Sequence, residues 1–277
     1  MARLRDTFRR LRQSGRRALI PFIMGGDPDL GSTPELLLAL QDAGADVIEV
    51  GIPFSDPLAD GPVIQAASAR ALARGATPAR ILVAVDRIRP KLRVPLVCLS
   101  YWNPLLQFSR PAASASSGSA LGPGAFLRAA QASGIDGLIV PDLPTEESGL
   151  LRQAADGSGV ATIFLAAPTS SARRLRAIAQ ASEGFIYYVS VTGTTGARRA
   201  LPSMLVKGLR QLRLVTTKPV CVGFGISTPA QAATVARVAD GVIVGSALIQ
   251  AMAQARGRAG ARQAAVTFVR RLRQAVS

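Results

Sequence analysis

Residues 47–62 read VIEVGIPFSDPLADGP, and this stretch decides the fold of the 277-residue chain. It begins with a short apolar run, residues 47–50, that contains a single carboxylate, Glu49. Side chains alternate between the two faces of a strand, so Glu49 shares a face with Val47 and the other face is apolar. A strand that is apolar on both faces is typical of a parallel sheet covered by helices. Burying an ionisable group costs free energy, so Glu49 is either a paired structural glutamate or a functional acid.

The loop that follows this strand is long and rich in proline. It runs from Gly51 to Gly61, well beyond the roughly 2–6 residues usual between a strand and a helix. Long loops of this kind commonly carry function. Asp60 stands just before Gly61 and Pro62, and proline is favoured at the first helical position. Asp60 is therefore predicted either to cap a helix or to act in a site.

Eight apolar runs alternate with amphipathic segments along the whole chain. They lie at residues 19–24, 47–50, 95–99, 137–140, 161–165, 185–189, 219–223 and 241–244. Three of the amphipathic segments open with Thr-Pro, at residues 33, 77 and 228, a pairing that favours a helix start. Eight such units favour a closed (β/α)₈ barrel over an open sheet. We expect an α/β protein with one TIM-barrel domain over residues 1–277 and an extra helix over residues 1–15 that covers the barrel floor.

Histidine is absent from the chain, and there are two cysteines. The lack of histidine excludes Ser-His-Asp and Cys-His nucleophile systems, and it leaves too few ligands for an ordinary zinc site. We therefore expect no metal site, and acid–base chemistry falls to carboxylates, tyrosines or lysines. Cys98 and Cys221 lie in apolar runs, which predicts buried, reduced thiols.

The net charge of +16 favours anionic ligands. The arginines are spread over predicted helices and rarely alternate with aromatic residues, so the sequence predicts no nucleic-acid partner. No apolar run approaches the ~18 residues of a membrane helix, and the N-terminus is arginine-rich where a signal peptide would be apolar. These features predict a cytoplasmic protein with no membrane partner.

In a (β/α)₈ barrel the active site lies at the carboxyl ends of the strands. Glu49 and Asp60 belong to this end after the second strand, and further polar residues follow later strands: Tyr101, Asn103, Asp142, Tyr187 and Ser190. Short polar residues beside prolines also organise turns, which is the alternative interpretation of Asn103 and Asp142.

Glycine-rich segments follow the last three strands, at residues 192–196, 223–227 and 245–246. Backbone N–H groups and a helix N-terminus commonly bind phosphate at this part of a barrel. Glycines that only turn the chain explain one such segment better than three. We therefore expect a substrate phosphate near Gly225, Gly245 and Ser246.

Two further features bear on the reaction. None of the lysines, Lys91, Lys207 and Lys218, is predicted at the carboxyl end of a strand, which disfavours a Schiff-base aldolase. A carbon–carbon cleavage would then need a substrate that serves as its own electron sink. Residues 109–124 are of low complexity and predict a flexible insertion after the third strand.

The chain closely resembles the tryptophan synthase alpha subunit family. The resemblance is carried by ALIPF (18–22), DVIEVGIPFSDP (46–57), ADGP (59–62), GLIVPDLP (137–144), YVSVTGTTG (188–196), GFGIS (223–227) and GS (245–246). It implies a barrel lyase that splits indole-3-glycerol phosphate into indole and glyceraldehyde 3-phosphate. It also implies a beta subunit partner in an alpha2beta2 heterotetramer, with pyridoxal phosphate in the beta subunit and no cofactor in this chain.

The resemblance also implies residue roles. Glu49 matches the principal acid–base residue, Asp60 the carboxylate that polarises the indole N–H, and Thr195 a loop residue that reaches Asp60 on closure. The matching phosphate contacts are Gly196, Gly225, Gly245 and Ser246, and the matching indole pocket consists of Phe22, Leu99, Tyr101 and Tyr187. The insertion at 109–124 departs from the short connection of the family.

Other functions remain open at this point. The chain could act alone as an indole-releasing lyase, or it could be a different phosphate-binding barrel enzyme, such as an indole glycerol phosphate synthase or a sugar-phosphate isomerase. A silent subunit that only docks a partner is a further alternative, although Glu49 and Asp60 are both present. The charge also leaves open a nucleic-acid binder.

Overall fold

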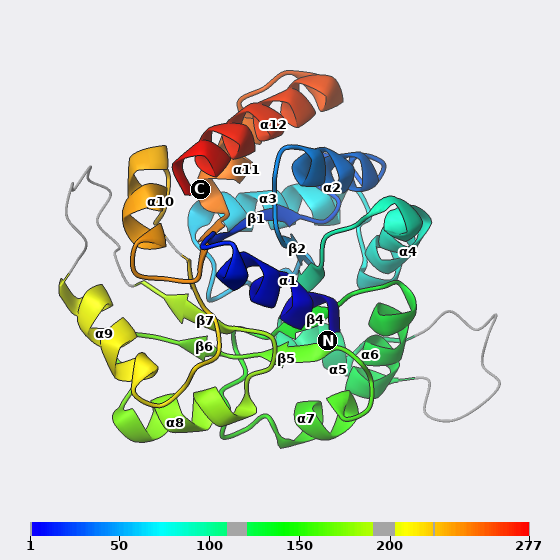
Figure 1. The fold of residues 1–277 in the computed structure, drawn as a ribbon. Coiled ribbons are helices and arrows are strands. Elements are labelled where there is room, and N and C mark those ends of the chain that lie inside the picture. The colour runs from blue at the N-terminus through cyan, green and yellow to red at the C-terminus, as the bar shows by residue number, and fades with distance from the viewer. Residues whose placement is uncertain (1, 110–120, 191–202, 224, 277) are drawn as a thin grey trace.

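The computed structural model describes residues 2–109, 121–190, 203–223 and 225–276. All strand pairs are parallel, in the order β5-β4-β3-β2-β1-β9-β8-β7-β6 (Figure 1). The strands are β1 Ala18–Met24, β2 Ile48–Gly51, β3 Leu96–Leu99, β4 Gly137–Ile139, β5 Ala161–Ile163, β6 Leu165–Ala166, β7 Ile186–Val189, β8 Val220–Gly223 and β9 Gly241–Val244.

The first and last strands in this order, β5 and β6, are two parts of one apolar run. Only Phe164 separates them, and its N–H donates to the Ser182 hydroxyl (3.2 Å). Because one part pairs with β4 and the other with β7, the run joins the two edges of the sheet. The prediction of a (β/α)₈ barrel is therefore confirmed.

Helices surround this barrel. They are α1 Ala2–Gln13, α2 Ser32–Asp42, α3 Pro62–Ala73, α4 Pro78–Ile88, α5 Trp102–Leu106, α6 Gly122–Ala132, α7 Gly149–Ala155, α8 Ala172–Ala181, α9 Ser203–Arg213, α10 Pro229–Ala236, α11 Ser246–Ala253 and α12 Gly257–Val276, with a short 3₁₀ turn at Arg89–Lys91. Ile48 and Val50 of β2 belong to the core between barrel and helices, which explains why the outer face of this strand is apolar.

The predicted helix starts were right at two of the three Thr-Pro pairs. Thr77 caps α4, and Thr228 forms a reciprocal capping box with Gln231 at the start of α10. The expectation for Thr33 was wrong, because α2 already begins at Ser32. The Thr33 hydroxyl instead accepts the Gly26 N–H (2.9 Å), so it stabilises the turn after β1.

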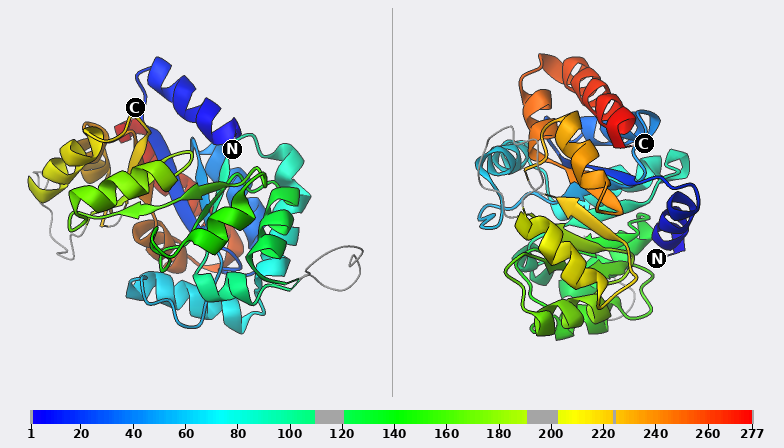
Figure 2. Two further views of the ribbon diagram at one scale, coloured as in Figure 1. Left: turned by 90° about the horizontal axis from the view of Figure 1, so that it is seen from below. Right: turned by 60° about the vertical axis from the view of Figure 1, so that its left-hand side comes forward.

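Helix α1 covers one end of the barrel, as predicted (Figure 2, left). Its residues Leu4, Phe8 and Leu11 are buried against side chains that point into the barrel, among them Val47 and Phe185. The Phe8 and Phe185 ring centroids are 5.6 Å apart. With this end sealed by apolar groups, the opposite end is the mouth.

Carboxylates hold the strands together at the floor. Asp46, Asp136 and Asp240 each precede a strand and accept the N–H of a residue in the preceding strand, at 2.9, 3.0 and 2.7 Å. Each also pairs with an arginine: Asp46 with Arg273, Asp136 with Arg89 and Asp240 with Arg213. Such charge-assisted bonds hold neighbouring strands in register at the floor of the barrel. The register at the floor also sets how the strand ends align at the mouth.

Some sequence expectations concern residues outside the described part of the chain. Most of the insertion at 109–124 lies there, although Ser109 forms an isolated antiparallel bridge with Leu121. The expected end of the insertion was wrong, because residues 122–124 already belong to α6. Among the described residues, Cys98 and Cys221 are free and buried, and no cluster of metal-binding side chains is found. No helix within those residues has the length and apolar character needed to cross a bilayer.

Candidate active site

Glu49 lies inside the barrel near its mouth. It sits in β2 between Phe22 of β1 and Val97 of β3, and it is 1% exposed. Its Oε2 has no hydrogen-bond partner among the described residues. Burial raises the pKa of Glu49 to about 8, with a smaller contribution from the negative charge of Asp60. Among the described residues no cation forms a salt bridge with Glu49, which disfavours the paired structural glutamate considered from sequence.

Asp60 lies in the loop between β2 and α3. The residue that caps α3 is Gly61, and it provides no side-chain bond, so the interpretation of Asp60 as a helix cap is wrong. Burial raises the pKa of Asp60 to about 6, while a hydrogen bond from Tyr101 lowers it. The Asp60 backbone carbonyl accepts a bond from Gln65 Nε2 (2.9 Å), which joins the loop to the helix.

Tyr101 ties this loop to the end of β3. Its hydroxyl accepts the Ala59 N–H (3.0 Å) and hydrogen-bonds the Asp60 carboxylate. Its ring packs on Phe54, with centroids 5.4 Å apart. The resemblance assigned Tyr101 only to the indole pocket. A bond between residues 42 positions apart leaves no trace in the sequence pattern, so this positioning role was missed.

We expect Tyr101→Phe to lower turnover by roughly 10–100-fold, because a hydrogen bond to a charged group contributes about 1.5–3 kcal/mol. The Tyr101 bond lowers the pKa of Asp60, so its loss should also move the acid limb of the pH–rate profile upward. Tyr188→Phe is the matched control, since the Tyr188 hydroxyl has no hydrogen-bond partner among the described residues. An unchanged acid limb in Tyr101→Phe would contradict the role.

The predicted pocket side chains lie around the mouth, and glycines make room for two of them. A Cβ on Gly51 would lie 2.7 Å from Phe22 Cζ, and one on Gly223 would lie 2.5 Å from the Tyr187 hydroxyl. Phe22 and Tyr187 are both buried, whereas Leu99 is partly exposed. These contacts explain why glycine stands at the ends of β2 and β8.

Among the described residues, those predicted to bind phosphate follow the ends of β8 and β9, two strands that pair with each other. Gly225 follows β8 and has φ +78°, a conformation that favours glycine. Gly245 follows β9 and is the N-cap of α11, which begins with exposed Ser246. The first N–H groups of a helix lack partners within it and can bind an anion. Thr195 and Gly196 lie outside the described residues.

The remaining polar candidates have structural partners. Asp142 is exposed and accepts the Trp102 N–H with both oxygens (2.9 and 3.2 Å), so it joins the turns after β3 and β4. Ser190 donates its hydroxyl to the Gly223 carbonyl (3.0 Å). Asn103 lies within the short helix α5. The alternative interpretation of Asp142 as a turn organiser fits the structure.

The geometry can be compared with known proteins. The family model described as "Tryptophan synthase alpha chain" matches residues 8–277. The chain is similar to the tryptophan synthase alpha chains of Gloeobacter violaceus, 53% identical over 86% of this chain and 82% of that protein, and of Geobacter sulfurreducens, 45% identical over 100% and 99%.

Solved structures agree in fold. Tryptophan synthase subunit alpha from Legionella pneumophila is 36% identical, covers 99% of this chain and 98% of its own, and has a TM-score of 0.87. A chain of Mycobacterium tuberculosis tryptophan synthase is also 36% identical, with the same coverage and a TM-score of 0.86. The chain therefore belongs to the tryptophan synthase alpha chain family, lyases that cleave indole-3-glycerol phosphate in tryptophan biosynthesis.

Proposed function

We propose that Glu49 and Asp60 are the two catalytic groups with which this chain cleaves indole-3-glycerol phosphate. The observation that carries this proposal is that their environments place the two pKa values on opposite sides of neutrality, at about 8 and about 6. At pH 7 Glu49 is then mainly protonated and Asp60 mainly ionised. Two carboxyl groups whose pKa values are pushed apart divide the acid and base roles between them.

The chemistry follows from these charge states. Protonated Glu49 gives its proton to the ring carbon that carries the glycerol chain, and the indole nitrogen becomes positive. The Asp60 carboxylate accepts the hydrogen bond of the indole N–H and stabilises that charge. Loss of the proton from the adjacent hydroxyl, assisted by Glu49, forms the aldehyde. The carbon–carbon bond breaks, and its electron pair returns to the ring as indole leaves.

The remaining site residues bind and enclose the substrate. Phe22, Leu99 and Tyr187 contact the indole, and Gly225, Gly245 and Ser246, with Gly196, bind the phosphate. Thr195 reaches Asp60 when the loop after β7 closes. For Thr195 and Gly196 the support is the sequence resemblance alone. For Leu99, Gly225, Gly245 and Ser246 it is their place at the carboxyl ends of the strands, where barrel enzymes bind substrates. For Phe22 and Tyr187 it is their close approach to the glycines that end β2 and β8.

The proposed assembly is an alpha2beta2 heterotetramer in the cytoplasm. The partner is a beta subunit that carries pyridoxal phosphate and receives indole from this chain, for which no cofactor is proposed. The family supports a beta partner.

The test is indole release from indole-3-glycerol phosphate by the purified chain, with and without a beta subunit. We expect slow release by the chain alone and faster release in the complex, because a partner that favours the closed loop raises the active fraction. Absence of release in both cases would refute the proposal. An equal rate in both, while a binding signal saturates, would indicate a stand-alone lyase.

A pH–rate profile is expected to be bell-shaped. Turnover should rise as pH passes the Asp60 pKa of about 6, because Asp60 must be ionised. It should fall as pH passes the Glu49 pKa of about 8, because Glu49 must hold its proton. Steady-state rates from pH 5 to 9.5 measure both limbs. Asp60→Asn should lack the acid limb, and a profile that keeps it would assign that limb to another group.

If Ser246 binds the phosphate, Ser246→Ala should weaken binding of a phosphorylated inhibitor but not of its unphosphorylated analogue. Ser246→Ala should weaken binding of indole-propanol phosphate by about tenfold or more, since a bond to a charged group contributes about 1.5–3 kcal/mol. It should leave binding of unphosphorylated indole-propanol unchanged. Calorimetric titration of both compounds measures the difference, and Ser203→Ala at the first residue of α9 is the control. Equal weakening of both compounds would remove Ser246 from the phosphate site.

A further inference from the structure

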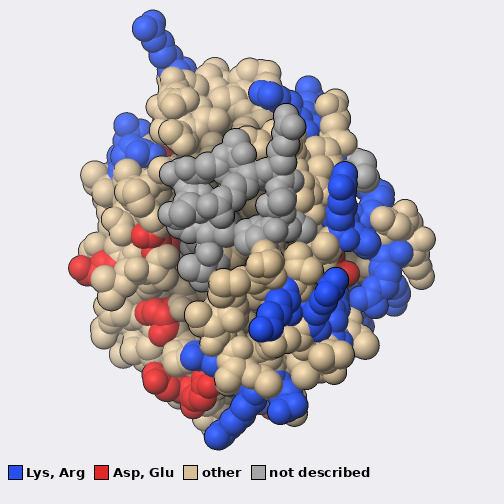
Figure 3. All heavy atoms as spheres, turned by 90° about the vertical axis from the view of Figure 1, so that its left-hand side faces the viewer, with Lys and Arg blue, Asp and Glu red and all other residues tan. Residues whose placement is uncertain are grey.

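The floor of the barrel carries a surface rich in arginine. We call it the floor patch and define it as Arg5, Arg9 and Arg12 of α1 with Arg16 and Arg17 that follow. Residues 2–17 contain seven arginines and a single acidic residue, Asp6. Arg5, Arg9 and Arg12 are spaced four and three apart, so they share one exposed face of the helix. In Figure 3, Lys and Arg side chains gather towards the side of the molecule that bears α1.

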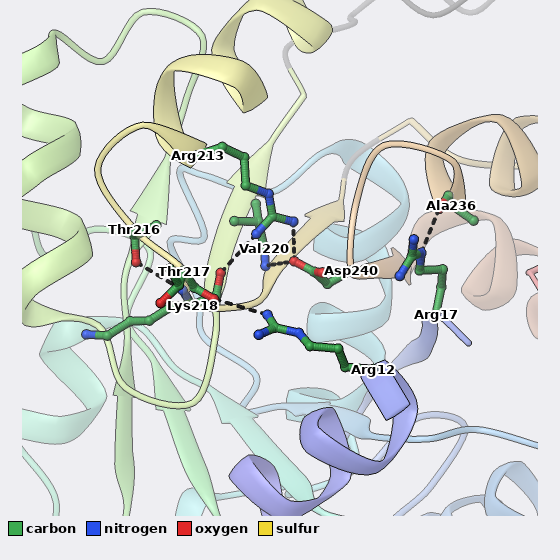
Figure 4. Close-up of polar contacts among 9 residues, drawn as sticks. All are labelled: Arg12, Arg17, Arg213, Thr216, Thr217, Lys218, Val220, Ala236 and Asp240. Carbon is green, nitrogen blue, oxygen red and sulfur yellow. Dashed lines mark hydrogen bonds and ion pairs between the residues drawn. The ribbon is translucent and has the colours of Figure 1, made fainter. Parts of the chain in front are cut away.

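The loop before β8 and the end of helix α10 hold parts of this patch in place. Arg12 donates to the Thr217 carbonyl (3.1 Å), and Arg17 donates to the Ala236 carbonyl (3.2 Å). Beside them, Arg213 donates to the Lys218 carbonyl and pairs with Asp240, as Figure 4 shows. A guanidinium has five N–H donors, so one bond to a carbonyl leaves others for an anion. Side chains held in advance lose less entropy when they bind.

The floor patch keeps an excess of positive charge, because the nearby carboxylates are largely paired with other groups. Asp240 and Asp46 are each bonded to a strand N–H and paired with Arg213 and Arg273. Within the patch, Arg9 pairs with Asp6 at 2.9 Å, and Arg16 lies 3.7 Å from Asp46. Among the described residues, no acidic side chain forms a salt bridge with Arg5, Arg12 or Arg17.

We propose that the floor patch binds the phosphate backbone of nucleic acid without reading its sequence. Arginine forks match phosphate geometry, which favours this class of polyanion. A membrane is disfavoured because Leu4, Phe8 and Leu11 are buried under the barrel and cannot insert into lipid. Binding of single strands is disfavoured because the large hydrophobic side chains exposed in the described residues include no aromatic ring on which bases could stack.

This proposal revises the expectation of no nucleic-acid partner in one respect. The sequence pattern shows no aromatic platform, and the described residues expose no large aromatic side chain. Folding does, however, place Arg12 against the loop before β8 and Arg17 against the end of α10, both distant in sequence. The patch lies at the opposite end of the barrel from Glu49, so it is independent of the proposed cleavage site.

The number of exposed arginines sets the expected salt dependence. Four of the five, Arg5, Arg9, Arg12 and Arg16, are exposed. If each neutralises one phosphate of a duplex, log K falls with log salt at a slope of about −3.6. Between 50 and 200 mM salt the affinity should then fall by roughly 150-fold. Removal of three contacts should leave a slope of about −0.9 and a loss of only about fourfold.

The experiment is fluorescence anisotropy of a labelled 30-base-pair duplex of arbitrary sequence titrated with the full-length chain. The variant Arg5→Gln/Arg9→Gln/Arg12→Gln is compared with Arg152→Gln/Arg256→Gln/Arg262→Gln, which removes the same charge from exposed positions on other elements. We expect the first variant to show the shallow slope and the second to keep a slope near that of the wild type. Scrambling the duplex sequence should not change the affinity.

Three outcomes would overturn the proposal: no binding to the duplex at 50 mM salt, an equal loss of slope in both variants, or binding to vesicles rich in phosphatidylserine without binding to the duplex. Arg12 also holds the Thr217 carbonyl, so thermal unfolding is recorded for each variant. If the triple variant is unfolded, Arg5→Gln/Arg9→Gln keeps that contact and should still reduce the slope by about 1.8.

Discussion

Glu49→Gln is expected to lower the rate of indole-3-glycerol phosphate cleavage by about 10²–10⁴-fold, the usual contribution of a general acid–base group. Glutamine fills the same buried space between Phe22 and Val97, but it has no proton to give at neutral pH. Substrate affinity should change little, because the residues proposed to bind the phosphate and the indole belong to other strands and loops. Single-turnover rates at saturating substrate, together with binding of indole-propanol phosphate, separate the two effects.

Two companion variants make this result specific. Glu49→Asp keeps the carboxylic acid but shortens the side chain by one methylene. Its cleavage rate should therefore lie between those of the wild type and Glu49→Gln. Glu35→Gln makes the same chemical change at an exposed position of α2 and should leave the rate unaltered. A Glu49→Gln enzyme that retains more than about a tenth of wild-type turnover would refute the assignment of Glu49.

The same substitution is expected to change how stability depends on pH. Folding raises the pKa of Glu49 from its ordinary value of 4.5 to about 8, so the folded state holds the proton more tightly between these values. Stability is then greatest below the unfolded pKa and is lost as pH rises towards the folded one. A difference of about 3.5 pKa units corresponds to a loss of about 4–5 kcal/mol across this interval.

Glu49→Gln removes this loss, because glutamine does not ionise. In urea unfolding at pH 4.5, 7 and 9, the free energy of unfolding of the variant should rise relative to that of the wild type at each step. It should exceed the wild-type value at high pH if the glutamine amide is accommodated. Asp60 shifts in the same direction with a pKa of about 6, so some pH dependence below pH 6 remains in the variant. Parallel stability curves for wild type and variant would show that Glu49 is already ionised in the folded protein at neutral pH.

Much of the architecture was predictable from sequence. Each expected apolar run agrees with its strand within one residue at each end, apart from the interruption at Phe164. The reason is that strands buried on both faces need continuous apolar residues, a requirement that acts locally along the chain. The end of β2 likewise placed Glu49 at the mouth, because barrel topology orients all strand ends alike.

The sequence by itself determined the barrel, its N-terminal helix and the position of Glu49 in the second strand, since these depend on hydrophobic patterns within short segments. Only the tertiary structure decided that Asp60 is free of capping, that Thr33 does not begin a helix, and that Tyr101 holds the loop after β2. It also decided the pKa values of Glu49 and Asp60. Desolvation and Coulomb interactions sum over groups that are distant in the chain and close in space, and no local pattern records that sum.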